Sequence, residues 1–205
     1  MRPSSILKMQ AASSYPFSRR KRVFDAVVVM LALAFLFVPL VILALCIKLT
    51  SPGPIFFRSN RIGRDNVIFS MLKFRTMRVG APVVATDKLV SPTDWITPLG
   101  SFMRRSSLDE LPQLINVLSG HMSIIGPRPA LYNQDDLIEE RTSRGVHLLR
   151  PGISGIAQIS GRDELSISSK VMADAEYLST AGFWADFRII LVSIRQIFVP
   201  RGMHH

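Results

Sequence analysis

The sequence predicts a single α/β domain, mostly helical, attached to an N-terminal membrane helix. Residues 26–47 form an uncharged run of 22 residues, the first of three observations behind this prediction. The second is a pair of short β-like runs, residues 55–58 and 67–75, with a turn-forming segment between them. The third is the recurrence of apolar residues at helical spacing in residues 111–118 and 183–198. A chain of 205 residues suits one domain of this kind.

The composition points to anionic partners. The formal net charge is +10, which leaves nucleic acid, an anionic membrane face and phosphorylated substrates open. The single cysteine, Cys46, rules out an internal disulfide. The four histidines are scattered, and no Cys/His spacing suggests zinc.

The N-terminal region divides into a leader and a membrane segment. Residues 1–18 are rich in Ser, Pro and Ala and are predicted to be a disordered leader. The apolar run that follows would be roughly 33 Å long as a helix, and no small-residue cleavage site closes it. Pro39 splits it into pieces shorter than the ~20 residues that a span needs. Because basic residues flank both ends, the positive-inside rule favours neither orientation. The pattern by itself favours a Pro-kinked spanning helix, with a re-entrant helix as the alternative.

The predicted strands carry two basic residues of interest. Lys73 and Arg75 are two positions apart, so on a strand they share one face. They could meet one anion there, or they could be solvated charges at a sheet edge. Residues 79–95 contain two prolines and little pattern, so they are predicted to form a loop.

Two adjacent carboxylates, Asp109 and Glu110, follow Arg104 and Arg105. One of the pair could attack an electrophile while the other holds a metal, with arginine binding phosphate. The alternative is an ordinary helix start, with Ser106 or Ser107 as the N-cap. Either way the pair lies at a helix N-terminus, where backbone N–H groups attract phosphate. The apolar positions predicted to bury one face of this helix, before a stop at Gly120, are Leu111, Leu114, Ile115 and Leu118.

Three further segments follow the carboxylate pair. Pro127 and Pro129 restrict the backbone around Arg128 and so fix its direction. Residues 135–144 form a polar surface helix, and residues 150–162 combine glycines with Arg150 and Arg162, as in a loop or strand approaching a phosphate. The apolar face of residues 183–198 suits a core helix or one lying in a membrane interface.

Four motifs in order resemble those of a known family. They are residues 73–77 (KFRTM), 107–113 (SLDELPQ), 126–129 (GPRP) and the stretch 150–162 that runs from RPG to GR. The chain resembles the small monotopic phosphoglycosyl transferases, bacterial sugar transferases that begin glycan assembly. The likeness runs from Lys21 to about Arg201.

The resemblance implies an enzyme that transfers a sugar 1-phosphate from a UDP-sugar to undecaprenyl phosphate. This is the first membrane step of exopolysaccharide, O-antigen or glycoconjugate assembly. Asp109 would attack the β-phosphate, form a covalent aspartyl-phosphosugar and release UMP. Glu110 would be a catalytic residue associated with Mg²⁺. The candidates for substrate contact are Lys73, Arg75, Arg104, Arg128, Arg150, Gln158 and Arg162.

The resemblance also implies a topology. Residues 19–50 would be a re-entrant membrane helix broken at Pro39, with both ends cytoplasmic. Residues 51–205 would be one catalytic domain on the cytoplasmic side of the bacterial inner membrane, seated by interfacial amphipathic helices. The family breaks its helix at a Ser-Pro pair, and here Val38 stands in place of the serine. The implied partners are UDP-sugar, undecaprenyl phosphate and membrane lipids rather than nucleic acid, with downstream glycosyltransferases and a homo-oligomer left open.

Two alternatives compete with this interpretation. A non-catalytic, membrane-anchored basic module binding anionic lipid or nucleic acid would explain the charge, but no stacking aromatics interleave with the basic residues. It also leaves the carboxylate pair unexplained. The second alternative is direct transfer without a covalent intermediate. The identity of the sugar depends on pocket contacts that these motifs do not specify.

Overall fold

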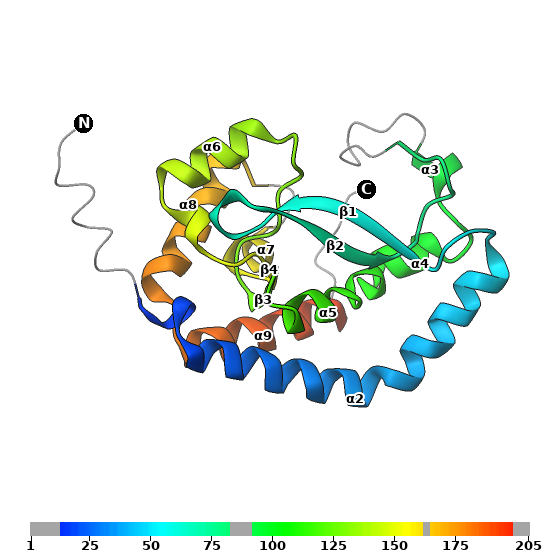
Figure 1. The fold of residues 1–205 in the computed structure, drawn as a ribbon, viewed down its shortest axis with the longest axis horizontal. Helices are drawn as coiled ribbons and strands as arrows, with labels where there is room; N and C mark the ends of the chain where they lie inside the picture. The colour runs from blue at the N-terminus through cyan, green and yellow to red at the C-terminus, as the bar shows by residue number, and fades with distance from the viewer. Residues whose placement is uncertain (1–12, 83–91, 162–164, 199–205) are drawn as a thin grey trace.

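The computed structural model describes residues 13–82, 92–161 and 165–198. Helices dominate, arranged around one long N-terminal helix, a β-hairpin and a second, short pair of strands (Figure 1). In chain order the elements are η1 (Tyr15–Phe17), α2 (Arg19–Thr50), β1 (Phe56–Ile62), η2 (Arg64–Asn66), β2 (Ile68–Phe74), α3 (Pro92–Trp95), α4 (Gly100–Arg105), η4 (Leu108–Glu110), α5 (Gln113–Leu118), β3 (Ser123–Ile125), α6 (Asp135–Ser143), η5 (Val146–Leu148), β4 (Gly152–Ser154), α7 (Ile156–Ser160), α8 (Ile167–Thr180) and α9 (Phe183–Phe198).

Helix α2 is continuous through Pro39, so the predicted break is wrong in its strict form. The helix curves instead, and its second half turns up toward the hairpin (Figure 1). Proline removes one backbone hydrogen bond and crowds the preceding turn, which bends a helix without ending it. By length and composition α2 could cross a membrane, and only 6% of its most apolar window is buried in the domain.

Both ends of α2 pack against the rest of the domain. Near its start, Val29 is fully buried in a cluster with Phe69 and Val117. Near its end, Ile47 is buried with Phe74 and Met103. The helix is therefore part of the domain's core at both ends, and its exposed apolar residues lie mainly between them.

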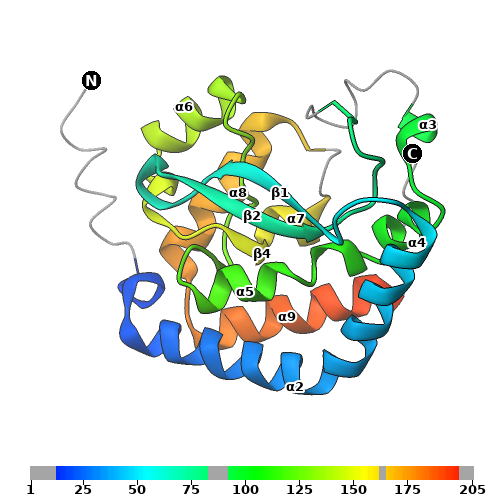
Figure 2. The ribbon, with the colours of Figure 1, turned by 45° about the vertical axis from the view of Figure 1, so that its right-hand side comes forward.

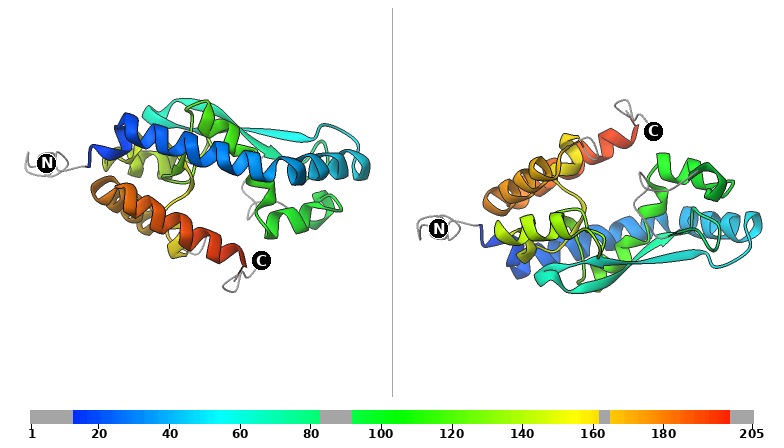
Figure 3. Two further views of the ribbon diagram at one scale, coloured as in Figure 1. Left: turned by 90° about the horizontal axis from the view of Figure 1, so that it is seen from below. Right: turned by 90° about the horizontal axis from the view of Figure 1, so that it is seen from above.

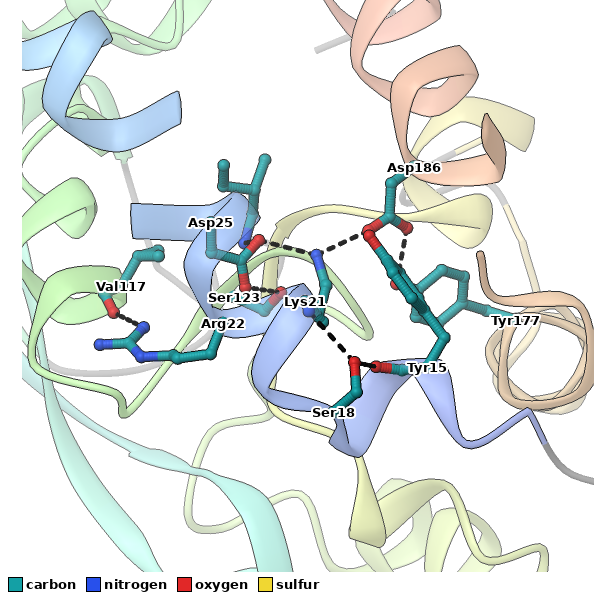
Figure 4. Close-up of polar contacts among 10 residues, drawn as sticks. Tyr15, Ser18, Lys21, Arg22, Asp25, Val117, Ser123, Tyr177 and Asp186 are labelled. Carbon is teal, nitrogen blue, oxygen red and sulfur yellow. Dashed lines mark hydrogen bonds and ion pairs between the residues drawn. The ribbon is translucent and has the colours of Figure 1, made fainter. Parts of the chain in front are cut away.

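A buried polar network fastens the first turns of α2 to α9 and β3 (Figure 4). The ammonium of Lys21 lies 2.7 Å from a carboxylate oxygen of Asp25 and 2.7 Å from one of Asp186. Tyr177 donates a hydrogen bond of 2.7 Å to Asp186, and Ser123 donates one of 2.8 Å to Asp25. The ammonium of Lys21 thus forms ion pairs with two carboxylates. Burial raises the pKa of Asp186, and the charge of Lys21 opposes this shift.

The strands form two separate pairs. β1 and β2 are antiparallel, with Phe56 opposite Phe74 and Ile62 opposite Ile68. β3 and β4 are parallel, with Ser123 opposite Gly152. Residues 123–125, for which the sequence predicted no strand, form β3. The described residues form a mostly helical domain, as predicted, with sheets of two strands only.

Two helices show apolar faces that the domain leaves uncovered. Leu114 of α5 is buried as predicted, but Ile115 and Leu118 are exposed, and Val117 is buried in their place. On α9 the exposed apolar side chains are Phe183, Trp184, Phe187, Leu191 and Ile194. Helices α2 and α9 lie together along one side of the molecule (Figure 2), and both stand in front when it is viewed from below (Figure 3, left). Phe24 and Phe183 join them, with ring centroids 5.2 Å apart.

The described end of the predicted leader is ordered against the domain. Ser13 donates a side-chain hydrogen bond of 2.7 Å to the carbonyl of Ala181, and Tyr15 packs on the cluster around Leu178. Ser18 then caps α2 by accepting a hydrogen bond from the Lys21 amide. Residues 13–18 therefore differ from the expected loose leader, and residues 1–12 lie outside the described part.

Candidate active site

Asp109 and Glu110 lie in a short 3₁₀ turn between α4 and α5. Ser107, just before this turn, has a left-handed backbone (φ 57°, ψ 17°), which is uncommon for a residue other than glycine. Ser107 stands at the N-cap position of this turn, with both acids in its first turn, but its side chain makes no capping hydrogen bond, and the Ser106 hydroxyl donates back to the carbonyl of Phe102. The helical start considered above is therefore a 3₁₀ turn without a serine side-chain cap.

Lys73 and Arg128 converge on this pair from distant parts of the chain. The Lys73 ammonium lies 2.8 Å from Oε1 of Glu110 and 3.5 Å from Oδ2 of Asp109. Arg128 Nη2 lies 2.9 Å from the same oxygen of Glu110. Asp109 is buried, and the side chains of Lys73 and Glu110 are each 16% exposed. One ammonium group thus bridges both carboxylates.

Two further arginines act on the pair electrostatically. Arg104, on α4, opposes protonation of Asp109. Arg61, in β1, interacts with Glu110 and Arg128, and its burial together with the Arg128 charge lowers its pKa to about 10. The described cluster therefore holds four cations and two carboxylates, which gives it net positive charge. Sequence reasoning placed Arg61 in the turn between the two predicted strands and did not name it as a site residue. The available signal was its place among the basic residues of this segment, between Arg58 and Arg64.

The two carboxylates have opposite electrostatic environments. Burial raises the pKa of Asp109; Lys73 and Arg104 oppose this shift, and Glu110 adds to it. Burial also acts on Glu110, but Arg128 and Lys73 outweigh it and hold the pKa of Glu110 well below its ordinary value. Glu110 therefore stays ionised, whereas Asp109 is the carboxylate with the higher proton affinity.

Other predicted site residues have different surroundings. Arg75 follows β2 and is buried, and its guanidinium binds the carbonyls of Ser51 and Pro52 after α2. Arg75 and Lys73 thus have different protein partners. Arg150 donates to the carbonyl of Gly120, 3.0 Å away. Both arginines fasten chain segments together in this structure.

Gln158 and Arg162 complete the predicted set. Gln158, in α7, is buried, and neither its amide nitrogen nor its amide oxygen has a hydrogen-bond partner among the described residues. Arg162 lies outside the described residues. The structure thus gathers four of the predicted residues with Lys73, namely Asp109, Glu110, Arg104 and Arg128.

The chemistry of the donor set suits Mg²⁺. This ion binds one or two carboxylates and takes its other ligands from water and substrate phosphates. Asp109 and Glu110 supply two adjacent carboxylates. No group of three or more His, Cys, Asp or Glu side chains that could enclose a metal occurs in the described ranges. The site therefore fits a metal shared with a phosphorylated substrate better than an all-protein metal cage.

Fold and site together define a class of protein. A cation-rich carboxylate pair suits phosphate chemistry, and an apolar helix long enough to enter a bilayer suits a membrane-associated protein. Residues 17–200 match the family model described as bacterial sugar transferase. The chain belongs to this family, as the sequence motifs indicated.

Several relatives carry more specific names. The UDP-glucose:undecaprenyl-phosphate glucose-1-phosphate transferase of Escherichia coli K12 is 39% identical over 197 residues, which cover 90% of this chain and 41% of the relative. The protein of the same name from Caulobacter vibrioides is 40% identical over 85% of this chain and 68% of its own length. The exopolysaccharide production protein ExoY of Rhizobium meliloti is 35% identical over 90% and 88%. The chain therefore spans about two fifths of the E. coli relative and nearly all of ExoY.

Proposed function

We propose that this protein transfers a sugar 1-phosphate from a UDP-sugar to undecaprenyl phosphate through a covalent intermediate on Asp109. The observation that carries the proposal is the buried Asp109 carboxylate beside Lys73, with Glu110 held by Lys73 and Arg128. Relatives named for glucose 1-phosphate transfer make UDP-glucose the first donor to test. Membership of the bacterial sugar transferase family supports the reaction class.

In the first step a carboxylate oxygen of Asp109 attacks the β-phosphorus of the UDP-sugar. The bond from that phosphorus to the bridging oxygen breaks, and UMP leaves with the electron pair. In the second step a phosphate oxygen of undecaprenyl phosphate attacks the same phosphorus. The bond to Asp109 then breaks, which regenerates the carboxylate and yields the undecaprenyl diphosphate sugar.

The surrounding cations make this attack feasible. A carboxylate approaching a diphosphate is repelled by its charge, and the positive cluster of Lys73, Arg104, Arg128 and Arg61 offsets that repulsion. When bound, Mg²⁺ would neutralise further charge on the phosphates. Glu110, which stays ionised, would hold it. Lys73 also keeps Asp109 more readily ionised and therefore nucleophilic.

The packing of α2 supports a re-entrant helix over a spanning one. Lys21 near its start and Ile47 near its end contact the same globular domain. A helix that crossed the bilayer would carry its two ends to opposite sides, so one set of these contacts would have to lie in lipid or beyond it. Both ends on the cytoplasmic side would keep the buried ion pairs and the charged site out of the bilayer.

The decisive chemical experiment is intact-mass measurement after quenching. Purified protein given UDP-glucose and Mg²⁺ without lipid acceptor should gain the mass of one hexose phosphate at Asp109 and release about one UMP per active site. Asp109→Asn should do neither, because an amide is a poor nucleophile. Asp136→Asn, which changes an exposed acid on α6, is the matched control and should behave like the wild type.

Two outcomes would change the assignment. If UMP appears only when undecaprenyl phosphate is present and no adduct is ever seen, direct transfer replaces the covalent route. If none of a panel of UDP-sugars yields UMP under either condition, the protein is not a sugar-phosphate transferase. A response to a UDP-sugar other than UDP-glucose would correct only the sugar.

Topology can be tested with single cysteines. In a Cys46→Ser background, Ser14→Cys and Asn60→Cys introduce thiols at exposed positions on either side of α2. A membrane-impermeant maleimide should label neither in intact cells and both after permeabilisation. Labelling of one site from outside would show that α2 spans the membrane.

A further inference from the structure

The turn that carries Arg128 is held almost entirely through its carbonyl groups. Pro127 and Pro129 have no N–H, so the backbone on both sides of Arg128 lacks donors. The carbonyl of Pro127 accepts from the Gly152 amide at 2.8 Å, and that of Ala130 accepts from the Ile62 amide at 3.0 Å. Strand β1 and the start of β4 thus fasten the two ends of the turn.

Arginine side chains fasten its centre. Arg141 Nη1 donates a hydrogen bond of 2.8 Å to the carbonyl of Arg128 itself. Arg61 Nη1 donates a longer one, 3.4 Å, to the carbonyl of Pro129. Of these two arginines, Arg141 makes the shorter bond, and it makes it to Arg128, the residue of the turn whose side chain reaches Glu110.

Arg141 is in turn oriented by a buried partner. Its other terminal nitrogen, Nη2, lies 2.8 Å from Oδ2 of Asp174, and the two side chains are 11% and 1% exposed. Arg141 comes from α6 and Asp174 from α8, so the pair joins two helices. One terminal nitrogen of the planar guanidinium pairs with Asp174, and the other donates to the carbonyl of Arg128. A lysine ammonium cannot reproduce this geometry.

We propose that the buried Arg141–Asp174 ion pair is a positioning device that sets where the Arg128 guanidinium meets Glu110 and the donor diphosphate. The Arg128 side chain is 52% exposed, so packing alone does not fix it, and its position depends on where the turn's backbone lies. Arg141 acts through Arg128 and is a positioning residue. The proposal rests on the proposed function, which supplies the diphosphate.

The test is a double-mutant cycle between Arg141 and Arg128. Arg141→Lys keeps the buried charge beside Asp174, so the protein should fold, but the carbonyl of Arg128 loses its fixed partner. Since a misplacement of about 1 Å can cost 10²-fold, kcat/KM for the UDP-sugar should fall by about tenfold or more. In an Arg128→Ala background the same substitution should cost less than about twofold, because the group that it positions is gone.

A second variant separates positioning from folding. Arg141→Met combined with Asp174→Leu replaces the pair by apolar side chains, which often leaves stability unchanged. Its thermal unfolding temperature should stay within a few degrees of the wild type, while activity falls as in Arg141→Lys. Arg144→Met is the matched control. Arg144 directly follows α6, and its described ion pair is an exposed contact of 3.7 Å to Glu140. This variant should leave activity unchanged.

UDP binding, measured by calorimetry, gives a readout that needs no transfer. Arg141→Lys should weaken it in the wild-type background and not in Arg128→Ala. Equal losses in both backgrounds, or no loss in either, would overturn the positioning role and make the pair purely structural. If the wild type binds UDP but transfers no sugar, the proposed function fails while the cycle on UDP affinity still decides the inference. If it does not bind UDP either, both fail.

Discussion

At the scale of single residues, Asp109 and Glu110 are neighbours whose carboxyl groups are held in different states. Lys73 contacts both carboxylates, and Arg128 contacts Glu110. Burial dominates the pKa of Asp109, whereas the cations dominate that of Glu110. This difference suits a division of labour in which Asp109 makes and breaks a bond while Glu110 stays an anion.

Lys73 should control the acid side of the pH profile. Asp109 attacks only when ionised, and its raised pKa means that activity is lost as the pH falls through a value above that of an ordinary aspartate. Since Lys73 lowers this pKa, Lys73→Met should move the acid limb to higher pH and reduce adduct formation at neutral pH by about tenfold or more.

The measurement is the rate of adduct formation from pH 5 to 9. Lys73→Arg keeps a cation and should leave the acid limb closer to that of the wild type. An acid limb that does not move in Lys73→Met would mean that a group other than Asp109 titrates.

Glu110→Gln should weaken metal use. The amide cannot supply an anionic ligand, so transfer should fall by about 100-fold and the Mg²⁺ concentration for half-maximal rate should rise. The measurement is a Mg²⁺ titration of UMP release. Glu139→Gln, an exposed change on α6, is the control. A lower rate at an unaltered Mg²⁺ requirement would assign Glu110 to orienting Lys73 and Arg128 rather than to the metal.

At the scale of elements, α2 is long and apolar enough to cross a membrane and is also a core helix at both ends. Its ends are buried in the domain and its middle carries exposed residues such as Phe35, which is 84% exposed. The curve in α2 brings both ends to one domain (Figure 1). Pro39 and the packing of the two ends are therefore two separate causes for the same shape.

Pro39→Ala distinguishes these causes. Without the proline the helix gains a backbone hydrogen bond and should straighten, which pulls Ile47 away from Phe74 and Met103. We expect part of the population to expose Ser14→Cys to the external maleimide and transfer to fall several-fold. Val38→Ala, which alters an exposed neighbour and keeps the proline, should change neither. If Pro39→Ala also changes neither, the packed ends determine the bend.

At the scale of the whole molecule, α2 and α9, which both carry exposed apolar residues, stand side by side in front when the domain is viewed from below (Figure 3, left). The two carboxylates of the active site lie on the turn between α4 and α5, and α5 itself carries the exposed apolar residues Ile115 and Leu118.

Trp184, which is 76% exposed on α9, reports whether this side meets lipid. With Trp95→Phe leaving one tryptophan, Trp184 fluorescence in vesicles should be blue-shifted and strongly quenched by brominated acyl chains, as for an interfacial helix. The reverse variant, Trp184→Phe with Trp95 retained, is the control and should show weaker quenching. Unquenched, red-shifted emission from Trp184 would place α9 in water.

Much of the fold could be predicted because it depends on local pattern. The apolar run, the hairpin and the polar helix over residues 135–143 follow from periodicity and turn residues. The β3–β4 pair and helix α8 were missed. Three-residue strands carry almost no periodic signal, and the pairing of Ser123 with Gly152 joins residues far apart in the chain.

The carboxylate pair, the membrane helix and the family motifs were determined by the sequence, because each is a short contiguous pattern. Which cations serve the pair was decided by the tertiary structure. Lys73 and Arg75 look equivalent on one strand, yet Lys73 reaches Glu110, 37 positions away, while Arg75 binds the carbonyls after α2. An arginine's partner depends on which acceptors the folded chain brings within about 3 Å, and a sequence pattern does not contain that distance.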